Sequence, residues 1–252
     1  MPAAVQEQTV TAQDYRAFRE QILQISKLRL DDPKNVDQAK KLLLAHDERE
    51  LSHGWVAQCG DVASHNAKFI QGVRTAAERA GGADQLIAQL KSQPAAALEI
   101  SGWQSASEDV VAAVSQDAAA MQALSFRLSE IAYGRTAKEA QLATEAQTKG
   151  SGVTGATRIS YRPNRAVSPM MTQILALGAV MALSTDSHVR SGPIEASLVV
   201  DKDNDQCLRW SDLNSKQCLA AARDNQERAY CLSEEAISSR SQCWSKVVQP
   251  AS

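Results

Sequence analysis

The stretch from Cys207 to Cys243 reads CLRWSDLNSKQCLAAARDNQERAYCLSEEAISSRSQC, and it contains four of the five cysteines in the chain. The inner cysteines, Cys218 and Cys231, and the outer ones, Cys207 and Cys243, share nearly the same midpoint, at Asn225. This symmetry is expected of two antiparallel helices that are joined near residue 225 and clamped by an inner and an outer disulfide. Four cysteines allow three pairings, and the sequence alone leaves the choice among them open.

The spacing within each half of this stretch adds a second observation. Cys207 and Cys218 are eleven residues apart, close to three turns of an α-helix, so both can face the same side. Cys231 and Cys243 are twelve apart, which carries Cys243 off that face, so an outer disulfide requires a bent or frayed helix end. Over residues 207–243 the pattern resembles the twin-cysteine helical hairpins of the coiled-coil-helix-coiled-coil-helix family, with slightly wider spacing. The resemblance implies a helical hairpin held by two disulfides.

The four clustered cysteines favour disulfides over a metal. Structural zinc sites bring their ligands in pairs roughly two to four residues apart, and the sequence contains no such pair. A module of this size has few large apolar side chains, and two disulfides would support it by about 2–4 kcal/mol each. Because disulfides persist in oxidising compartments, we expect the C-terminal segment to lie outside the cytoplasm. Cys59 stands alone and is interpreted as a small buried apolar residue.

The composition of the whole chain predicts a mainly α-helical protein. Hydrophobic residues make up 44% and aromatic residues only 4% of the 252 residues, and the apolar positions are mostly Ala and Leu, which helices tolerate best. The formal net charge of -2 provides no general polyanion-binding surface, so nucleic acid is not an expected partner. Residues 1–20 lack the apolar core of a signal peptide.

Apolar residues at three- and four-residue steps predict a helical, bundle-like N-terminal domain over residues 1–147. The expected helices cover residues 11–30, 35–53, 55–80, 84–91 and 105–147. Their expected breaks are Pro33, His53-Gly54, Gly81-Gly82 and Ser101-Gly102, with Gly134 as a candidate division of the longest helix.

Residues 148–165 change character and are interpreted as a flexible basic linker. They begin with a run of small polar residues and continue with three arginines, without apolar periodicity. Gly150, Gly152 and Gly155 match a dinucleotide-binding GxGxxG motif by letter, but that motif requires a strand before it and a helix after it, and neither is expected here. We place the main domain boundary at this linker.

Residues 166–185 contain no charged side chain and predict one uncharged helix. A membrane span requires roughly twenty predominantly apolar residues, a length that this stretch just reaches. Arginines precede it and mostly acidic residues follow it, which favours a single-pass bacterial inner-membrane protein with residues 1–165 in the cytoplasm and residues 186–252 in the periplasm. The alternative is a buried core helix in a soluble cytoplasmic protein.

The final segment, residues 186–252, also contains a weak calcium-loop pattern. Asp201, Asp203 and Asp205 occupy the first, third and fifth positions of such a loop, and Asp212 occupies the twelfth. Gln206 replaces the glycine of the sharp turn, and the last ligand is Asp in place of a bidentate Glu. The alternative interpretation is a solvated acidic segment that precedes a helix.

The histidines match the patterns of metal sites and activated nucleophiles only in part. Glu50 and His53 form an ExxH pair, and His46 lies two turns earlier on the same helical face. A di-iron bundle needs two such pairs and two further carboxylates, whereas this chain has four histidines and no second ExxH. Cys59 lies between His53 and His65 in the sequence, but nothing supplies the third, orienting group that an activated nucleophile requires.

These patterns contain no recognisable catalytic signature. We therefore expect a non-enzymatic protein-interaction or scaffolding protein of the bacterial envelope, with a protein partner and without a cofactor; membrane association and homo-oligomerisation are left open. The alternative is a soluble helical regulatory or metal-binding protein in which residues 166–185 pack in the core.

Overall fold

The computed structural model describes residues 12–134, 167–186 and 196–245, and within these ranges the secondary structure is helical, as the composition predicted, without a strand. The helices are α1 (Gln13–Ile25), α2 (Pro33–Leu43), α3 (Glu48–Ser64), α4 (Ala67–Ala80), α5 (Ala83–Ser92), the 3-10 helix η1 (Pro94–Glu99), α6 (Trp103–Tyr133), α8 (Pro169–Asp186), α9 (Ala196–Val199), α10 (Lys202–Ala221), α11 (Asn225–Cys231), the π-helix η2 (Leu232–Ser238) and α12 (Ser239–Ser245).

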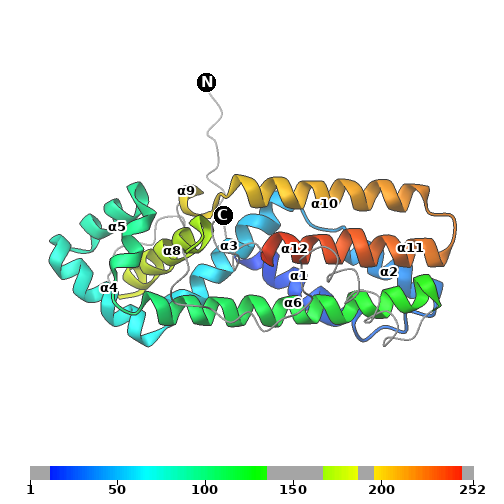
Figure 1. Cartoon of the computed structure of the whole chain (residues 1–252), viewed down its shortest axis with the longest axis horizontal. Coiled ribbons are helices and arrows are strands. Elements are labelled where there is room, and N and C mark those ends of the chain that lie inside the picture. Colours follow the sequence, from blue (N-terminus) through cyan, green and yellow to red (C-terminus); the bar gives the residue numbers. More distant parts are fainter. Residues whose placement is uncertain (1–11, 135–166, 187–195, 246–252) are drawn as a thin grey trace, which may run out of the picture.

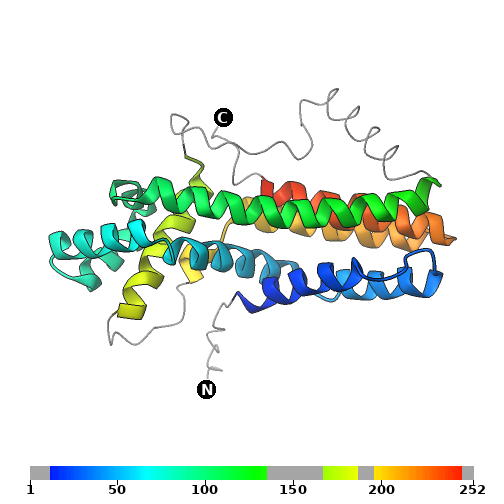
Figure 2. The same ribbon diagram turned by 90° about the horizontal axis from the view of Figure 1, so that it is seen from below.

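The molecule is elongated, and its longest helices, α6 and α10, run along the long axis (Figure 1). One end is a helical bundle in which α10, α11 and α12 lie beside α6 and the N-terminal helices α1 to α3 (Figures 1 and 2). The other end is formed by α4, α5 and η1, with α8 between the two ends. The cysteine hairpin is therefore one layer of the bundle.

Asx side chains at the helix starts set several boundaries, because each accepts hydrogen bonds from backbone N–H groups that have no helical partner. Asp47 accepts from the N–H groups of Arg49 and Glu50, and Asn66 accepts from the N–H of Phe69. The predicted break at His53-Gly54 is wrong, since α3 begins at Glu48 and runs through both residues.

The glycines after two helices were interpreted correctly. Gly81 and Gly134 adopt the left-handed conformation, with φ of 89° and 59°, at the C-terminal ends of α4 and α6. The long predicted helix over 105–147 thus begins at Trp103 and, in the described residues, ends at Gly134. The continuation to residue 147 and the linker predicted for 148–165 lie outside the described residues.

The uncharged stretch forms α8, which packs in the hydrophobic core, as the alternative interpretation expected. Ile174, Leu175 and Leu177 are at most 1% exposed. Two glycines permit the close approach of α8 to α3: a Cβ atom at Gly60 would lie 2.8 Å from the Leu177 side chain, and one at Gly178 would meet α3 in the same way. Among the described helices, none has the length and apolarity that crossing a membrane requires.

The buried apolar side chains form one continuous cluster that extends from Tyr15 in α1 to Trp244 in α12 and includes the apolar residues of α8. The segments that the sequence divides into 1–147, 166–185 and 186–252 therefore contribute to a single core. Ser52 of α3 and Asp205 of α10 are in direct contact, so the N-terminal helices and the cysteine hairpin pack against each other.

Candidate functional site

The C-terminal hairpin consists of α10 on one side and the continuous run of α11, η2 and α12 on the other. Its disulfides join Cys218 to Cys231 near the tip and Cys207 to Cys243 near the base, which confirms the nested pairing that the common midpoint favoured. The tip is capped twice: Asp224 accepts from the N–H of Glu227, and the Glu227 carboxylate accepts from the N–H of Arg223. The hairpin is thus constrained at both ends.

The π-helix η2 resolves the mismatch between the two cysteine spacings. Hydrogen bonds of the i→i+5 type accommodate one residue more than an α-helical turn does. The twelve residues from Cys231 to Cys243 therefore span the same three turns as the eleven from Cys207 to Cys218, and both pairs face each other. The sequence predicted a bent or frayed end; the structure instead has a wider helical turn.

The same π-helix aligns two hydroxyls with the long helix α6. Ser233 and Ser238 are five residues apart, and the Oγ atoms of both lie within 3.0 Å of the Oγ atom of Ser125. Ser129 also contacts Ser233, at 2.7 Å between Oγ atoms. These short side chains allow η2 to pack closely on α6, and their hydroxyl groups satisfy one another in the buried interface.

Aromatic side chains dock α12 onto the N-terminal helices. Trp244 is 3% exposed, stacks on Trp55 at 6.1 Å between ring centroids, and meets Tyr15 and Phe18 edge to face at 5.2 and 5.6 Å. Such pairs are worth about 0.5–1.5 kcal/mol beyond the area that they bury. Trp244 is therefore the main apolar anchor between the end of the hairpin and α1 and α3.

An ion pair lies beside these rings. Arg240 is fully buried; it donates to Glu48 and, at 2.8 Å, to the carbonyl oxygen of Leu43, and its guanidinium lies 5.9 Å from the centroid of the Phe18 ring. Burial raises the pKa of Glu48, and the nearby guanidinium offsets only part of that rise. Sequence reasoning missed both residues, because their pairing joins positions almost two hundred residues apart.

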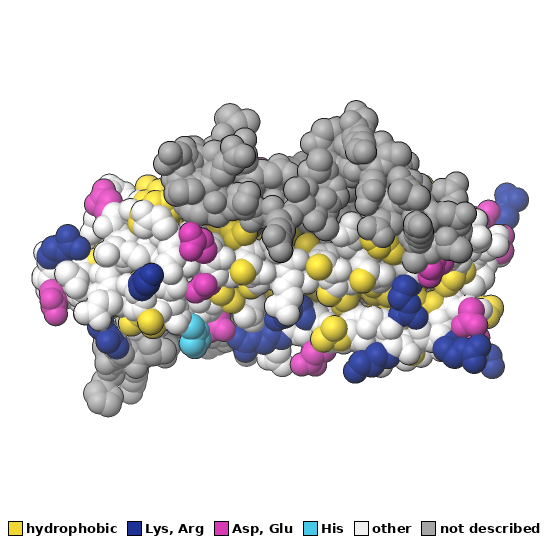
Figure 3. Space-filling view, turned by 60° about the horizontal axis from the view of Figure 1, so that its bottom comes forward, with side chains coloured by type: hydrophobic (Ala, Val, Ile, Leu, Met, Phe, Trp, Pro, Cys, Tyr) yellow, Lys and Arg dark blue, Asp and Glu magenta, His cyan; other side chains and the backbone are white. Residues whose placement is uncertain are grey.

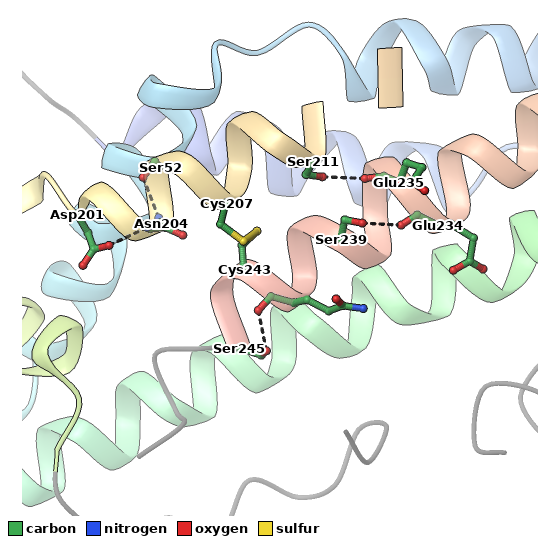
Figure 4. Close-up of a disulfide and its surroundings, with 11 residues drawn as sticks. Ser52, Asp201, Asn204, Cys207, Ser211, Glu234, Glu235, Ser239, Cys243 and Ser245 are labelled. Atoms are coloured by element: carbon green, nitrogen blue, oxygen red, sulfur yellow. Dashed lines mark hydrogen bonds between the residues drawn. A yellow bond between two sulfur atoms is a disulfide. The ribbon is translucent and has the colours of Figure 1, made fainter. Parts of the chain in front are cut away.

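A polar contact joins the start of α10 to α3 (Figure 4). Ser52 donates to Asp205 at 2.5 Å and accepts from the side-chain amide of Asn204 at 2.8 Å. His53 Nε2 lies 3.4 Å from the other carboxylate oxygen of Asp205. Ser52 is fully buried and donates directly to the carboxylate, so this serine, histidine and aspartate lack the relay geometry of an activated nucleophile.

The four carboxylates of the calcium-loop pattern are not brought together. Asp201 caps α10 by accepting from the N–H of Asn204, Asp205 contacts α3, and Asp212 accepts from Lys216 at 2.6 Å. Asp203 lies exposed in the first turn of α10. The pattern is used as a helix start, and no group of three or more potential metal ligands forms within the described ranges.

The remaining histidine and cysteine candidates also lie apart. Glu50 is exposed, His46 contacts Gln21 at 2.5 Å, and His65 contacts the carbonyl oxygen of Asp61. Cys59 is buried, as expected, and burial strongly raises the pKa of its thiol, which leaves almost no thiolate to act as a nucleophile. His46 and His65 thus have structural partners, and the candidate side chains do not form a common site within the described residues.

The outward face of α10 carries two large apolar side chains. Trp210 is 56% exposed and Leu213, three residues later, is 42% exposed, so they are neighbours on one helical face. Both disulfides hold α10 in place. Figure 4 shows the outer one, together with the hydrogen bond from Ser211 to the carbonyl oxygen of Glu235. A rigid helix thus presents an aromatic and an aliphatic group to solvent.

The chain matches no protein-family model, no curated protein and no solved structure. The features of the described residues that bear on function are the hairpin, its junction with the N-terminal helices and the exposed face of α10.

Proposed function

We propose that the protein is a non-enzymatic protein-interaction or scaffolding protein of the bacterial envelope, and that Trp210 and Leu213 on α10 form part of its contact surface. The observation that carries the proposal is the exposure of these two side chains on a helix that two disulfides hold in place. Trp is enriched among residues that dominate binding energy, and a fixed helix loses little conformational entropy when it binds.

The disulfides support an oxidising compartment, such as the bacterial periplasm. Because α3 and α10 pack against each other, we extend this compartment to the described helices as a whole, in place of a topology in which a membrane separates residues 1–165 from residues 186–252. Charge gives no support for a polyanionic partner: the net charge is -2, and on the face in Figure 3 basic and acidic side chains are interspersed.

A site-specific photo-crosslinker tests the proposed surface in the intact protein. With the crosslinking residue at position 210, we expect a discrete adduct with one protein partner, whereas position 71, exposed on α4 at the other end of the molecule, should give little or none. The partner, identified by mass spectrometry and purified, should bind the W210A/L213A variant at least about 30-fold more weakly than the wild type, which corresponds to one strong hot spot.

Matched controls separate surface effects from folding effects. The variant Q71A alters an exposed polar residue of α4, away from α10, and should bind normally. Equal crosslinking at positions 210 and 71, or unchanged affinity of W210A/L213A for the purified partner, would refute the assignment. If the adduct is a second copy of the chain, sedimentation of the wild type and of W210A/L213A should show the loss of that oligomer.

A further inference from the structure

The end of the hairpin is attached to the rest of the molecule in two different ways. Covalently, the disulfide from Cys243 holds α12 to Cys207 of α10. Non-covalently, Trp244 and Arg240 insert between α1 and α3, where they contact Trp55 and Glu48. The seven residues of α12 therefore sit between one covalent clamp and one docking interface.

The docking interface buries polar atoms that lack hydrogen-bond partners. Within the described residues, Glu48 Oε2, Arg240 Nε and Trp244 Nε1 are buried without a hydrogen-bond partner. Each such atom loses its hydration when the interface forms and regains it when the interface opens. The charged groups of Arg240 and Glu48 also lose hydration when α12 docks, and they regain it when α12 opens. The docked position of α12 thus gains less from its own contacts than its burial alone would suggest.

We propose that α12 is a redox-controlled latch: the Cys207–Cys243 disulfide keeps α12 docked, and its reduction by a dithiol reductant releases α12 and uncovers the aromatic surface formed by Tyr15, Phe18 and Trp55. Cys207 is the half-buried partner and Cys243 the buried one, so the clamp is approached through Cys207. The inner disulfide, Cys218–Cys231, closes the tip and does not hold α12.

The exchange is a two-electron reduction. A thiolate of the reductant attacks Cys207 Sγ, a mixed disulfide forms, and Cys243 leaves as a thiolate that takes up a proton when it reaches water. The second thiol of the reductant, as a thiolate, then attacks the reductant's other sulfur in the mixed disulfide. This step releases Cys207 as a thiolate and leaves the reductant as a disulfide. This device is independent of the proposed contact surface on α10, because neither Trp210 nor Leu213 takes part in it.

Two paired cysteine variants of the full chain test the latch by amide hydrogen exchange. In C207A/C243A we expect exchange in peptides covering residues 239–245 to accelerate by about 100-fold, the factor that the loss of one disulfide's entropic restraint can produce. In C218A/C231A, which retains the outer clamp, exchange over 239–245 should stay within a few-fold of wild type. Far-UV circular dichroism should show that both variants keep their helices.

Reduction and reoxidation of the wild type complete the test. A dithiol should raise the quenching of tryptophan fluorescence by a soluble quencher, and reoxidation should reverse the change. Unchanged protection of residues 239–245 in C207A/C243A would show that docking alone holds α12 and would overturn the proposal. Loss of helix throughout C207A/C243A would overturn it as well, because α12 would then not be a separable element.

Discussion

The register of the hairpin can be tested by deleting one residue from either side of it. We expect deletion of Glu235, inside η2, to be tolerated, because Cys231 and Cys243 then become eleven residues apart, like the pair on α10. The π-helix can revert to α-helix without moving either cysteine off its face. Ser233 and Ser238 would become four residues apart, a spacing that still places both toward Ser125.

The matched control is deletion of Asn214, an exposed residue in the middle of α10. That deletion rotates Cys207 by about 100° relative to Cys218, because each residue of an α-helix advances by that angle. The two disulfides cannot then form at the same time without distortion of the helices. The chain-entropy relation assigns about 3.8 kcal/mol to a bridge closing 36 residues and about 2.9 kcal/mol to one closing 13, so losing either should lower the free energy of unfolding by about 3 kcal/mol.

The assay combines disulfide mapping with thermal unfolding. After alkylation of free thiols, mass spectrometry of the Glu235 deletion should show both native bridges, and that of the Asn214 deletion should show at least one lost. The midpoints of unfolding should differ by at least about 6 °C, from roughly 2 °C per kcal/mol for a chain of this size. If the Glu235 deletion loses the outer bridge, or is as unstable as the Asn214 deletion, the π-helix does not serve to align the cysteines.

Four further predictions concern residues buried in the core. R240M should cost about 3–5 kcal/mol in guanidinium unfolding by leaving the buried Glu48 charge without its partner, and R240M/E48L should recover most of that loss; an additive double variant would contradict this. A raised carboxyl pKa means that the native state binds the proton more tightly than the unfolded state does. The stability that Glu48 contributes is therefore full below its unfolded pKa of about 4.3 and is lost as pH rises through its folded pKa. As pH rises from about 4 to 7, the free energy of unfolding of E48Q should increase relative to that of the wild type, and an opposite trend would disprove the burial argument. G178L should lower the free energy of unfolding by about 1–3 kcal/mol because its Cβ would lie 2.7 Å from that of Ala63, and without reductant Cys59 should react with a maleimide only after denaturation.

Features that depend on neighbouring residues were predictable from the sequence. The common midpoint of the cysteines indicated the hairpin and favoured the nested pairing without selecting it, and Gly81 and Gly134 ended helices where the left-handed conformation was needed. The error at His53-Gly54 has a local cause as well. Gly54 is buried inside α3, and the stronger signal was the cap residue Asp47, which marks where the helix begins.

Features that depend on distant residues were not predictable in this way. Residues 166–185 have the same apolarity whether a lipid or a protein surrounds them, and nothing within this stretch identifies Gly60 of α3 as the place where Leu177 packs. Arg240 lies in a polar run of serines and would be expected at the surface; its burial follows from Glu48. Asp205 matched a calcium ligand in the sequence because nothing there identified Ser52 as its partner.

The polar contacts explain how one hairpin position is selected among several that an apolar interface would tolerate. Arg240 with Glu48, Ser233 with Ser125 and Asp205 with Ser52 join the hairpin to α3 and α6 at three separate places. Sliding the hairpin by one residue would leave several of these groups buried without partners, at about 1–3 kcal/mol each, whereas apolar contacts would largely be replaced by equivalents. The disulfides determine the alignment within the hairpin, since they hold α10 beside α11 and α12 whether or not the hairpin is docked. Removing a disulfide should therefore change how often α12 opens, and removing a polar pair should change where it docks.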